Sequence, residues 1–164
     1  MKIAIFDVDD TIILHGNESH NYYTTSNSNF RELLESKNFD KVYLYTNGTW
    51  GHGNSIAEHL DIQDMISFIY GRDNLQSVRD SNGSLLYPKH MKPHIESFQF
   101  VNSSIQYESG SYDNEVYFFD DLKQNLETAN QIGWKTILIK PNTNTEPYIN
   151  YVFPNIYAAL LNLV

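Results

Sequence analysis

Five short apolar runs in the chain predict five β-strands. The runs are rich in isoleucine, valine, tyrosine and phenylalanine, and most are continuous rather than alternating, as in strands that are buried on both faces. We expect strands at Lys2–Phe6, Lys41–Tyr45, Ile66–Tyr70, Glu115–Phe119 and Lys135–Lys140.

Helical patterns lie between and after these runs. Their apolar residues are three or four positions apart, and the stripes begin at Phe30, Ile56, Ile95, Leu126 and Ile156. Start and stop residues flank them: Ser26 or Ser28, Asn54, Pro93, Pro154-Asn155 and, as a terminator, Gly133. Strands that alternate with helices predict an α/β fold, in which a mostly parallel five-stranded sheet lies between helices.

The chain is expected to form one domain. Its 164 residues suit a single hydrophobic core over residues 1–164. One connection, Arg72–Met91, is unusually long and contains Asn82-Gly83 between apolar neighbours, which is a β-hairpin signal. We therefore expect at most a hairpin insertion near residues 74–90 and no second domain.

Charge and composition limit the classes of partner that the protein could bind. The formal net charge is −9 with only 11 lysines and arginines, so a polynucleotide partner is unlikely, because such proteins need a basic surface. The chain has no cysteine, which excludes disulfides and thiolate metal sites. No apolar run reaches the roughly 18 residues of a membrane span, and the N-terminal apolar run is too short for a signal peptide. A cytoplasmic protein without a membrane partner is expected.

Polar residues follow three of the predicted strands. The first strand ends in Asp7–Thr11, the second in Thr46–Gly48 and the fourth in Asp120-Asp121. Because the carboxyl ends of parallel strands meet at one edge of a sheet, these side chains should lie together. Several acids in one place repel one another without a cation, so we expect a hard metal ion such as Mg²⁺.

These residues resemble the four sequence motifs of the haloacid dehalogenase (HAD) superfamily. Asp7–Thr11 is similar to the first motif, Asp-x-Asp-x-Thr, and Thr46 to the second, a Thr or Ser that closes the second strand. Lys92-Pro93 before a helix resembles the third motif, and Asp120-Asp121, followed by Asn125, resembles the fourth. The resemblance covers most of the chain. It implies a Rossmann-like HAD fold and a Mg²⁺-dependent phosphatase.

The resemblance also implies how the reaction would proceed. Asp7 would attack phosphorus and form an aspartyl-phosphate, and Asp9 would act as general acid and then as general base. The phosphoryl oxygens would be bound by Thr46, Asn47 and Lys92.

For the metal, the resemblance implies three ligands: Asp7, Asp120 and the backbone carbonyl of Asp9. Asp121 would orient Lys92 or a metal-bound water. Two alternatives stay open. Lys89, three residues before Lys92, could be the phosphate-site lysine, although Pro93 favours Lys92, and Asp121 could be no more than a helix N-cap.

Two other function classes fit parts of the sequence. A phospho-receiver signalling domain also has acids after its first strand, a threonine and a Lys-Pro pair. It needs its phosphoacceptor aspartate after a middle strand, whereas Tyr45 leads here to Thr46-Asn47. A non-catalytic HAD-like binding module is the second alternative. Against it, the residues that catalysis would need are all present: Asp7, Asp9, Thr46, Lys92 and Asp120.

HAD phosphatases usually select substrates with a cap domain, and this sequence has no room for one. Residues 12–40 already include the predicted Phe30 helix, and Arg72–Met91 suits a hairpin rather than a domain. A capless phosphatase is therefore expected, acting on a small phosphate ester, a nucleotide or a phosphoprotein. By resemblance, such a protein could form a homo-oligomer in which a neighbour covers the site.

Overall fold

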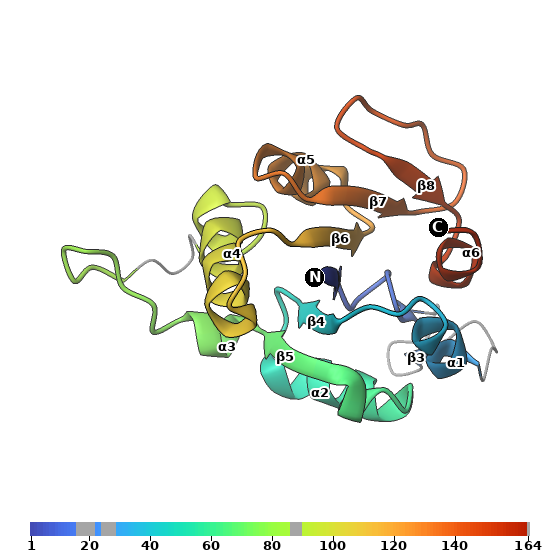
Figure 1. The fold of residues 1–164 in the computed structure, drawn as a ribbon, viewed down its shortest axis with the longest axis horizontal. Coiled ribbons are helices and arrows are strands. Elements are labelled where there is room, and N and C mark those ends of the chain that lie inside the picture. The colour runs from blue at the N-terminus through green and yellow to red at the C-terminus, as the bar shows by residue number, and fades with distance from the viewer. Residues whose placement is uncertain (16–21, 24–28, 86–89, 164) are drawn as a thin grey trace.

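The computed structural model describes residues 1–15, 22–23, 29–85 and 90–163. Its centre is a six-stranded sheet in which every pairing is parallel, in the order β5-β4-β1-β6-β7-β8 (Figure 1). The strands are β1 (Lys2–Phe6), β4 (Lys41–Tyr45), β5 (Ile66–Tyr70), β6 (Glu115–Asp120), β7 (Lys135–Ile139) and β8 (Tyr151–Phe153).

The predicted α/β fold is confirmed, but the predicted number of five strands is wrong. The sixth strand, β8, lies at the edge of the sheet beside β7. It has three residues, none of them fully buried, and its apolar run is shorter than the runs by which the other strands were recognised.

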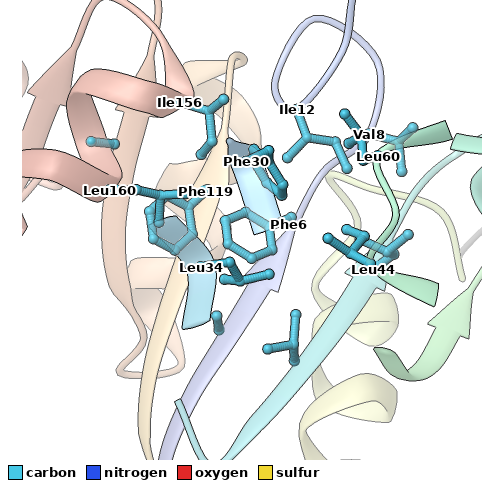
Figure 2. Close-up of a cluster of buried hydrophobic side chains, with 14 of the residues drawn as sticks. Phe6, Val8, Ile12, Phe30, Leu34, Leu44, Leu60, Phe119, Ile156 and Leu160 are labelled. Atoms are coloured by element: carbon cyan, nitrogen blue, oxygen red, sulfur yellow. The ribbon is translucent and has the colours of Figure 1, made fainter. Parts of the chain in front are cut away.

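Helices cover both faces of the sheet (Figure 1). One face carries α1 (Phe30–Glu35), α2 (Trp50–His59) and α6 (Ile156–Asn162), and the other carries α3 (Arg72–Leu75), α4 (Ile95–Ser109) and α5 (Lys123–Gln131). Each face has its own cluster of buried apolar side chains, and Figure 2 shows the first of them. The continuous apolar strands are explained by this arrangement, because alternate residues of a strand enter opposite clusters. In β1, Ala4 and Phe6 enter one cluster, whereas Ile3 and Ile5 enter the other.

The helix signals give mixed results. Asn155 caps α6 with its side chain, and Gly133 follows α5 with φ of +86°, as expected of a terminating glycine. The N-cap of α1 is Asn29, and both serines proposed for that role lie outside the described residues. Helix α4 begins at Ile95, two residues later than Pro93 suggested.

Two short antiparallel features interrupt the α/β pattern. Strands β2 (Leu14–His15) and β3 (Tyr22–Tyr23) pair after β1. In the long connection, Arg79 and Leu85 form an antiparallel bridge around Gly83, whose φ is +81°, as the Asn82-Gly83 signal predicts; residues 86–89 lie outside the described ranges. A short 3-10 helix, η1 (Gln63–Met65), precedes β5.

Within the described residues, no helix combines the length and the apolar character that crossing a membrane requires.

Candidate active site

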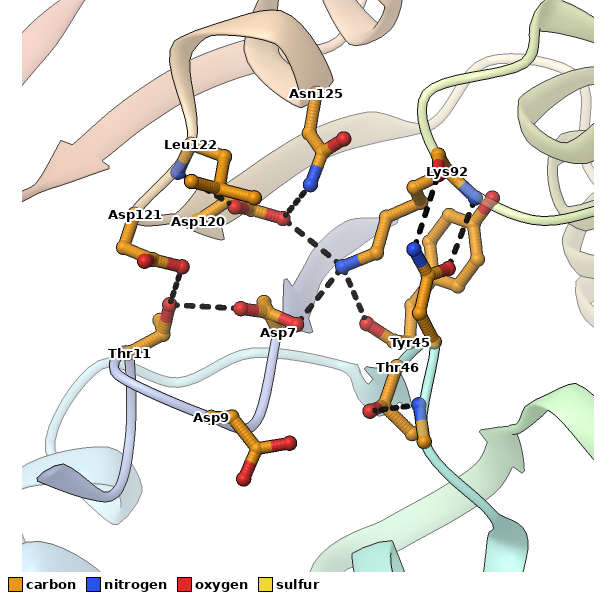
Figure 3. Close-up of polar contacts among 12 residues, drawn as sticks. Asp7, Asp9, Thr11, Tyr45, Thr46, Lys92, Asp120, Asp121, Leu122 and Asn125 are labelled. Atoms are coloured by element: carbon orange, nitrogen blue, oxygen red, sulfur yellow. Dashed lines mark hydrogen bonds and ion pairs between the residues drawn. The ribbon is translucent and has the colours of Figure 1, made fainter. Parts of the chain in front are cut away.

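The site lies where β1, β4 and β6 end. Phe6 and Phe119 are partners in the β1–β6 register, and their rings stack with centroids 4.5 Å apart. The next residue of β1 continues the ladder, because the Asp7 N–H donates to the Phe119 carbonyl over 2.9 Å. Packing of the core therefore delivers Asp7 and Asp120 side by side at the edge of the sheet (Figure 3).

Lys92 joins these two acids. Its Nζ donates to Asp7 Oδ1, to Asp120 Oδ2 and to the Tyr45 carbonyl, each over 2.9 Å. The Lys92 side chain is 1% exposed and that of Asp120 is fully buried. A buried ammonium with three oxygen partners is held in one position. The structure thus places Lys92 in the site, whereas Lys89 lies outside the described residues.

Asp121 belongs to the same acidic group. The Thr11 hydroxyl lies 3.1 Å from Asp7 Oδ2 and 3.4 Å from Asp121 Oδ1. One oxygen from each of Asp7, Asp120 and Asp121 lies within 4.8 Å of the other two. The alternative of an N-cap fails, because α5 is preceded by Leu122, whose N–H is bound by Asp120 Oδ1 over 2.8 Å.

Three carboxylates facing one ammonium leave an excess of negative charge in a largely buried place. All the side-chain donors are hard oxygens, which is the ligand type that Mg²⁺ prefers. The donor set therefore fits a divalent cation held by Asp7, Asp120 and Asp121. Figure 3 shows the carboxylate of Asp9 apart from this group. This agrees with the sequence analysis in one respect, because the ligand predicted at Asp9 is its backbone carbonyl and not its side chain.

Asn47 holds the segment that carries Lys92. Its side-chain amide donates to the Lys92 carbonyl over 3.0 Å and accepts from the Lys92 N–H over 2.9 Å. These two bonds fix the backbone of the segment that carries Lys92, across from the end of β4. The side chain of Asn47 therefore positions Lys92, and Asn47 also lines the pocket, where its contact with phosphate stays a prediction.

The remaining predicted residues line a pocket. Thr46 is buried, and its hydroxyl accepts from the Gly48 N–H over 2.9 Å. Asp9 and His52 share a hydrogen bond, in which Asp9 Oδ1 lies 2.8 Å from His52 Nε2. A pocket of about 280 Å³ opens over these residues, lined by Asp7, Asp9, Asp10, Thr46, Asn47, Gly48, Lys92, Asp121, Leu122 and Asn125. That volume suits a phosphoryl group and a small part of what carries it.

Several solved structures share this architecture. A protein assigned as a β-phosphoglucomutase, from Thermotoga maritima, has a TM-score of 0.63 at 15% identity, covering 99% of this chain and 98% of that one. A haloacid dehalogenase-like hydrolase from Streptococcus pneumoniae has a TM-score of 0.55 at 10% identity, covering 92% of each chain. The chain has the haloacid dehalogenase fold.

A third structure of the HAD fold is longer. A protein from Haemophilus somnus, predicted to be a phosphoglycolate phosphatase, has a TM-score of 0.58 at 18% identity; 87% of this chain is covered, but only 57% of that one. This chain thus spans just over half the length of that relative. No protein-family model matches the sequence.

Burial changes the acidity of the acids at the end of the HAD sheet. Burial raises the pKa of Asp7 from 3.8 to about 6, although the Lys92 charge acts in the opposite direction. Burial, and then the charge of Asp7, raise the pKa of Asp120 to about 6 as well. Burial opposes charge on Lys92, but Asp120 and Asp7 outweigh it and raise its pKa. The metal-free cluster therefore holds protons that a bound cation would replace.

These shifts predict a pH-dependent stability in the metal-free protein. The folded state keeps protons on Asp7 and Asp120 up to about pH 6, whereas the unfolded chain loses them near pH 4. Their contribution to the free energy of unfolding is thus fully present below about pH 4 and is lost as the pH rises to about 6. Asp7→Asn removes the Asp7 share. Denaturant unfolding in excess chelator should show the difference, wild type minus Asp7→Asn, falling across this window; a flat or rising difference contradicts the assignment.

Sequence reasoning missed two polar neighbours of the site. Asn125 is buried on α5, and its Nδ2 donates to Asp120 Oδ2 over 3.0 Å, so it holds that carboxylate in place. It was noted as part of the fourth motif, but no role was given to it. His52 was not among the predicted site residues; the structure places it in the first turn of α2.

Proposed function

We propose that this protein is a Mg²⁺-dependent phosphomonoester hydrolase that works through an aspartyl-phosphate on Asp7. One observation carries the proposal: Asp7 is held between Lys92 and Thr11, beside Asp120 and Asp121, and lines the pocket at the end of the sheet. A carboxylate fixed next to a cation site and a lysine is suited to meet a phosphate dianion.

Bound Mg²⁺ would offset the repulsion between the negatively charged Asp7 carboxylate and the phosphate dianion. The chain's own residues do the rest. The Asp7 carboxylate bonds to phosphorus as the bond to the leaving oxygen breaks, and Asp9 gives its proton to that oxygen. A water then attacks phosphorus while Asp9 takes its proton, and Asp7 is released. The Lys92 ammonium and the Thr46 hydroxyl stabilise charge on the phosphoryl oxygens.

Substrate and assembly are proposed from what surrounds the pocket. Among the described residues that line it, Lys92 is the one cation, and it is engaged by Asp7 and Asp120. A long polyanion would gain little there, so small phosphate esters, nucleotides or phosphoproteins are the proposed substrates. A second copy of the chain that covers the pocket is proposed as a source of further contacts.

Phosphate release from 4-nitrophenyl phosphate tests the proposal. Wild type should release phosphate with Mg²⁺ present, whereas a phospho-receiver domain or a binding module should show no steady turnover. A panel of phosphorylated metabolites, nucleotides and phosphopeptides, run under the same conditions, then ranks the substrate classes. Absence of turnover on every member of the panel contradicts the proposed function.

Lys92→Ala should lower kcat/KM by about 10²-fold or more, because it removes a charge that stabilises the transition state in a buried site. Lys135→Ala is the matched control. The Lys135 side chain is 44% exposed at the start of β7, away from the strand ends that form the site, and it pairs with Glu115. Its loss should change kcat/KM very little. Lys89→Ala serves as the second comparison. A larger loss from Lys89→Ala than from Lys92→Ala would overturn the choice of lysine.

A further inference from the structure

His52 contacts the residue to which the mechanism assigns proton transfer. Its Nε2 lies 2.8 Å from Asp9 Oδ1. The His52 side chain is 24% exposed and that of Asp9 is 37% exposed, so the pair is partly open to solvent, and Asp9 lines the pocket. A surface pair of this kind contributes little to stability. Its position beside the pocket therefore needs a reason other than holding the fold together.

The first turn of α2 is fixed in a way that sets the position of His52. Thr49 Oγ1 accepts from the His52 N–H over 3.1 Å, and Asp73 Oδ1 accepts from the Trp50 N–H over 2.7 Å. Gly71 lies against the same turn so closely that a Cβ there would be 2.6 Å from the Trp50 nitrogen. The backbone that carries His52 is thus anchored to the segment after β5, and its ring needs little further ordering to reach Asp9.

Gly48 leaves space beside this pair. A Cβ at Gly48 would be 3.4 Å from His52 Cδ2, 3.2 Å from Thr46 Oγ1 and 3.9 Å from Asp9 Oδ2. The ring, the phosphate-site threonine and the second oxygen of Asp9 therefore surround one small space that opens into the pocket. His52 engages Oδ1, whereas Oδ2 lies on the side of Gly48.

We propose that His52 is a positioning residue for Asp9, which holds its carboxyl group in the orientation for proton transfer to the leaving oxygen. The inference rests on the proposed function and deepens it. The Nε2–H of His52 donates to Oδ1, so the proton that Asp9 transfers is carried on Oδ2. Without the ring, Asp9 loses this contact, and a smaller fraction of molecules present Oδ2 to the substrate.

The dependence on the leaving group separates this role from a structural one. A nitrophenolate leaves without a proton, whereas an alkoxide needs one from Asp9. His52→Ala should lower the single-turnover rate of ethanol release from ethyl phosphate by about 10-fold or more, and that of nitrophenol release from 4-nitrophenyl phosphate by less than about 3-fold, because this first step precedes the one in which Asp9 acts as a base for both substrates. His52→Gln, whose amide N–H can replace Nε2–H, should recover most of the ethyl phosphate activity. His59→Ala, an exposed histidine in the last turn of α2, should change neither substrate.

Thermal unfolding of each variant confirms that a loss of rate is not a loss of fold. Equal losses on both substrates, no loss on ethyl phosphate, or no recovery with Gln would overturn the role of His52. Failure of the proposed function gives a different result, namely a wild type that hydrolyses neither ester, and the inference then falls with it.

Discussion

Asp7→Asn should lower turnover of 4-nitrophenyl phosphate by on the order of 10³-fold or more, the range seen when an enzyme loses its nucleophile. The amide has the shape of the carboxylate but neither its charge nor its nucleophilic oxygen. The fold should persist, because the strand that ends at Asp7 is held by Phe6 in the core and by the Asp7 N–H on the Phe119 carbonyl.

Asp61→Asn is the control for this substitution. Asp61 lies outside the site with φ of +56°, a backbone conformation that asparagine adopts well, so its change should affect neither fold nor rate. Steady-state kinetics and circular dichroism on the two variants give the comparison. Near-normal turnover by Asp7→Asn would mean that water attacks phosphorus directly, and the covalent mechanism would be wrong.

Removal of divalent metal should reduce turnover to background. Asp7, Asp120 and Asp121 repel one another and a phosphate dianion, and within the described part of the chain Lys92 is the cation that contacts Asp7 and Asp120. Dialysis against chelator followed by added Mg²⁺ should restore the rate, and high Ca²⁺ should inhibit, because its larger and more flexible coordination distorts an octahedral site. Full activity in excess chelator would contradict the metal assignment.

The position of Asp121 makes the metal prediction sharper. Since the structure groups it with Asp7 and Asp120, Asp121→Asn should raise the Mg²⁺ concentration needed for half-maximal activity by about 10–100-fold. The Mg²⁺-dependent rise in the thermal unfolding midpoint should weaken in parallel, which is a readout independent of catalysis. Unchanged Mg²⁺ dependence in this variant would place Asp121 outside the cation site.

The sequence predicted the parts of the molecule that depend on local patterns. Continuous apolar runs mark β1, β4, β5, β6 and β7 to within a residue, because most of these strands are buried on both faces; in β5, Ser67 and Phe68 are exposed. The acids that follow β1 and β6 were expected at one edge, and parallel pairing brings them together there. That part of the site follows from topology alone.

The parts that were missed depend on contacts between distant segments. Strand β8 is defined by its pairing with β7, and its own apolar run is only three residues long. The start of α2 at Trp50 depends on the Thr49 cap and on Asp73, 23 residues away from Trp50, and glycines at 51 and 53 conceal the helix. The contact of the Asn47 amide with the Lys92 backbone spans 45 residues. None of these pairings is visible in a local pattern.

Trapping the phosphoenzyme in an Asp9→Asn variant tests the central claim most directly. With 4-nitrophenyl phosphate the first step needs no proton donor, whereas the second step needs Asp9 as a base, so the intermediate should accumulate. Borohydride reduces an acyl phosphate to an alcohol, and peptide mass spectrometry then locates the modified residue. We expect modification at Asp7 in Asp9→Asn, only with substrate and Mg²⁺ present, and none in the variant that also carries Asp7→Asn. Release of one equivalent of nitrophenol with no modification at Asp7, or with modification elsewhere, would contradict the account.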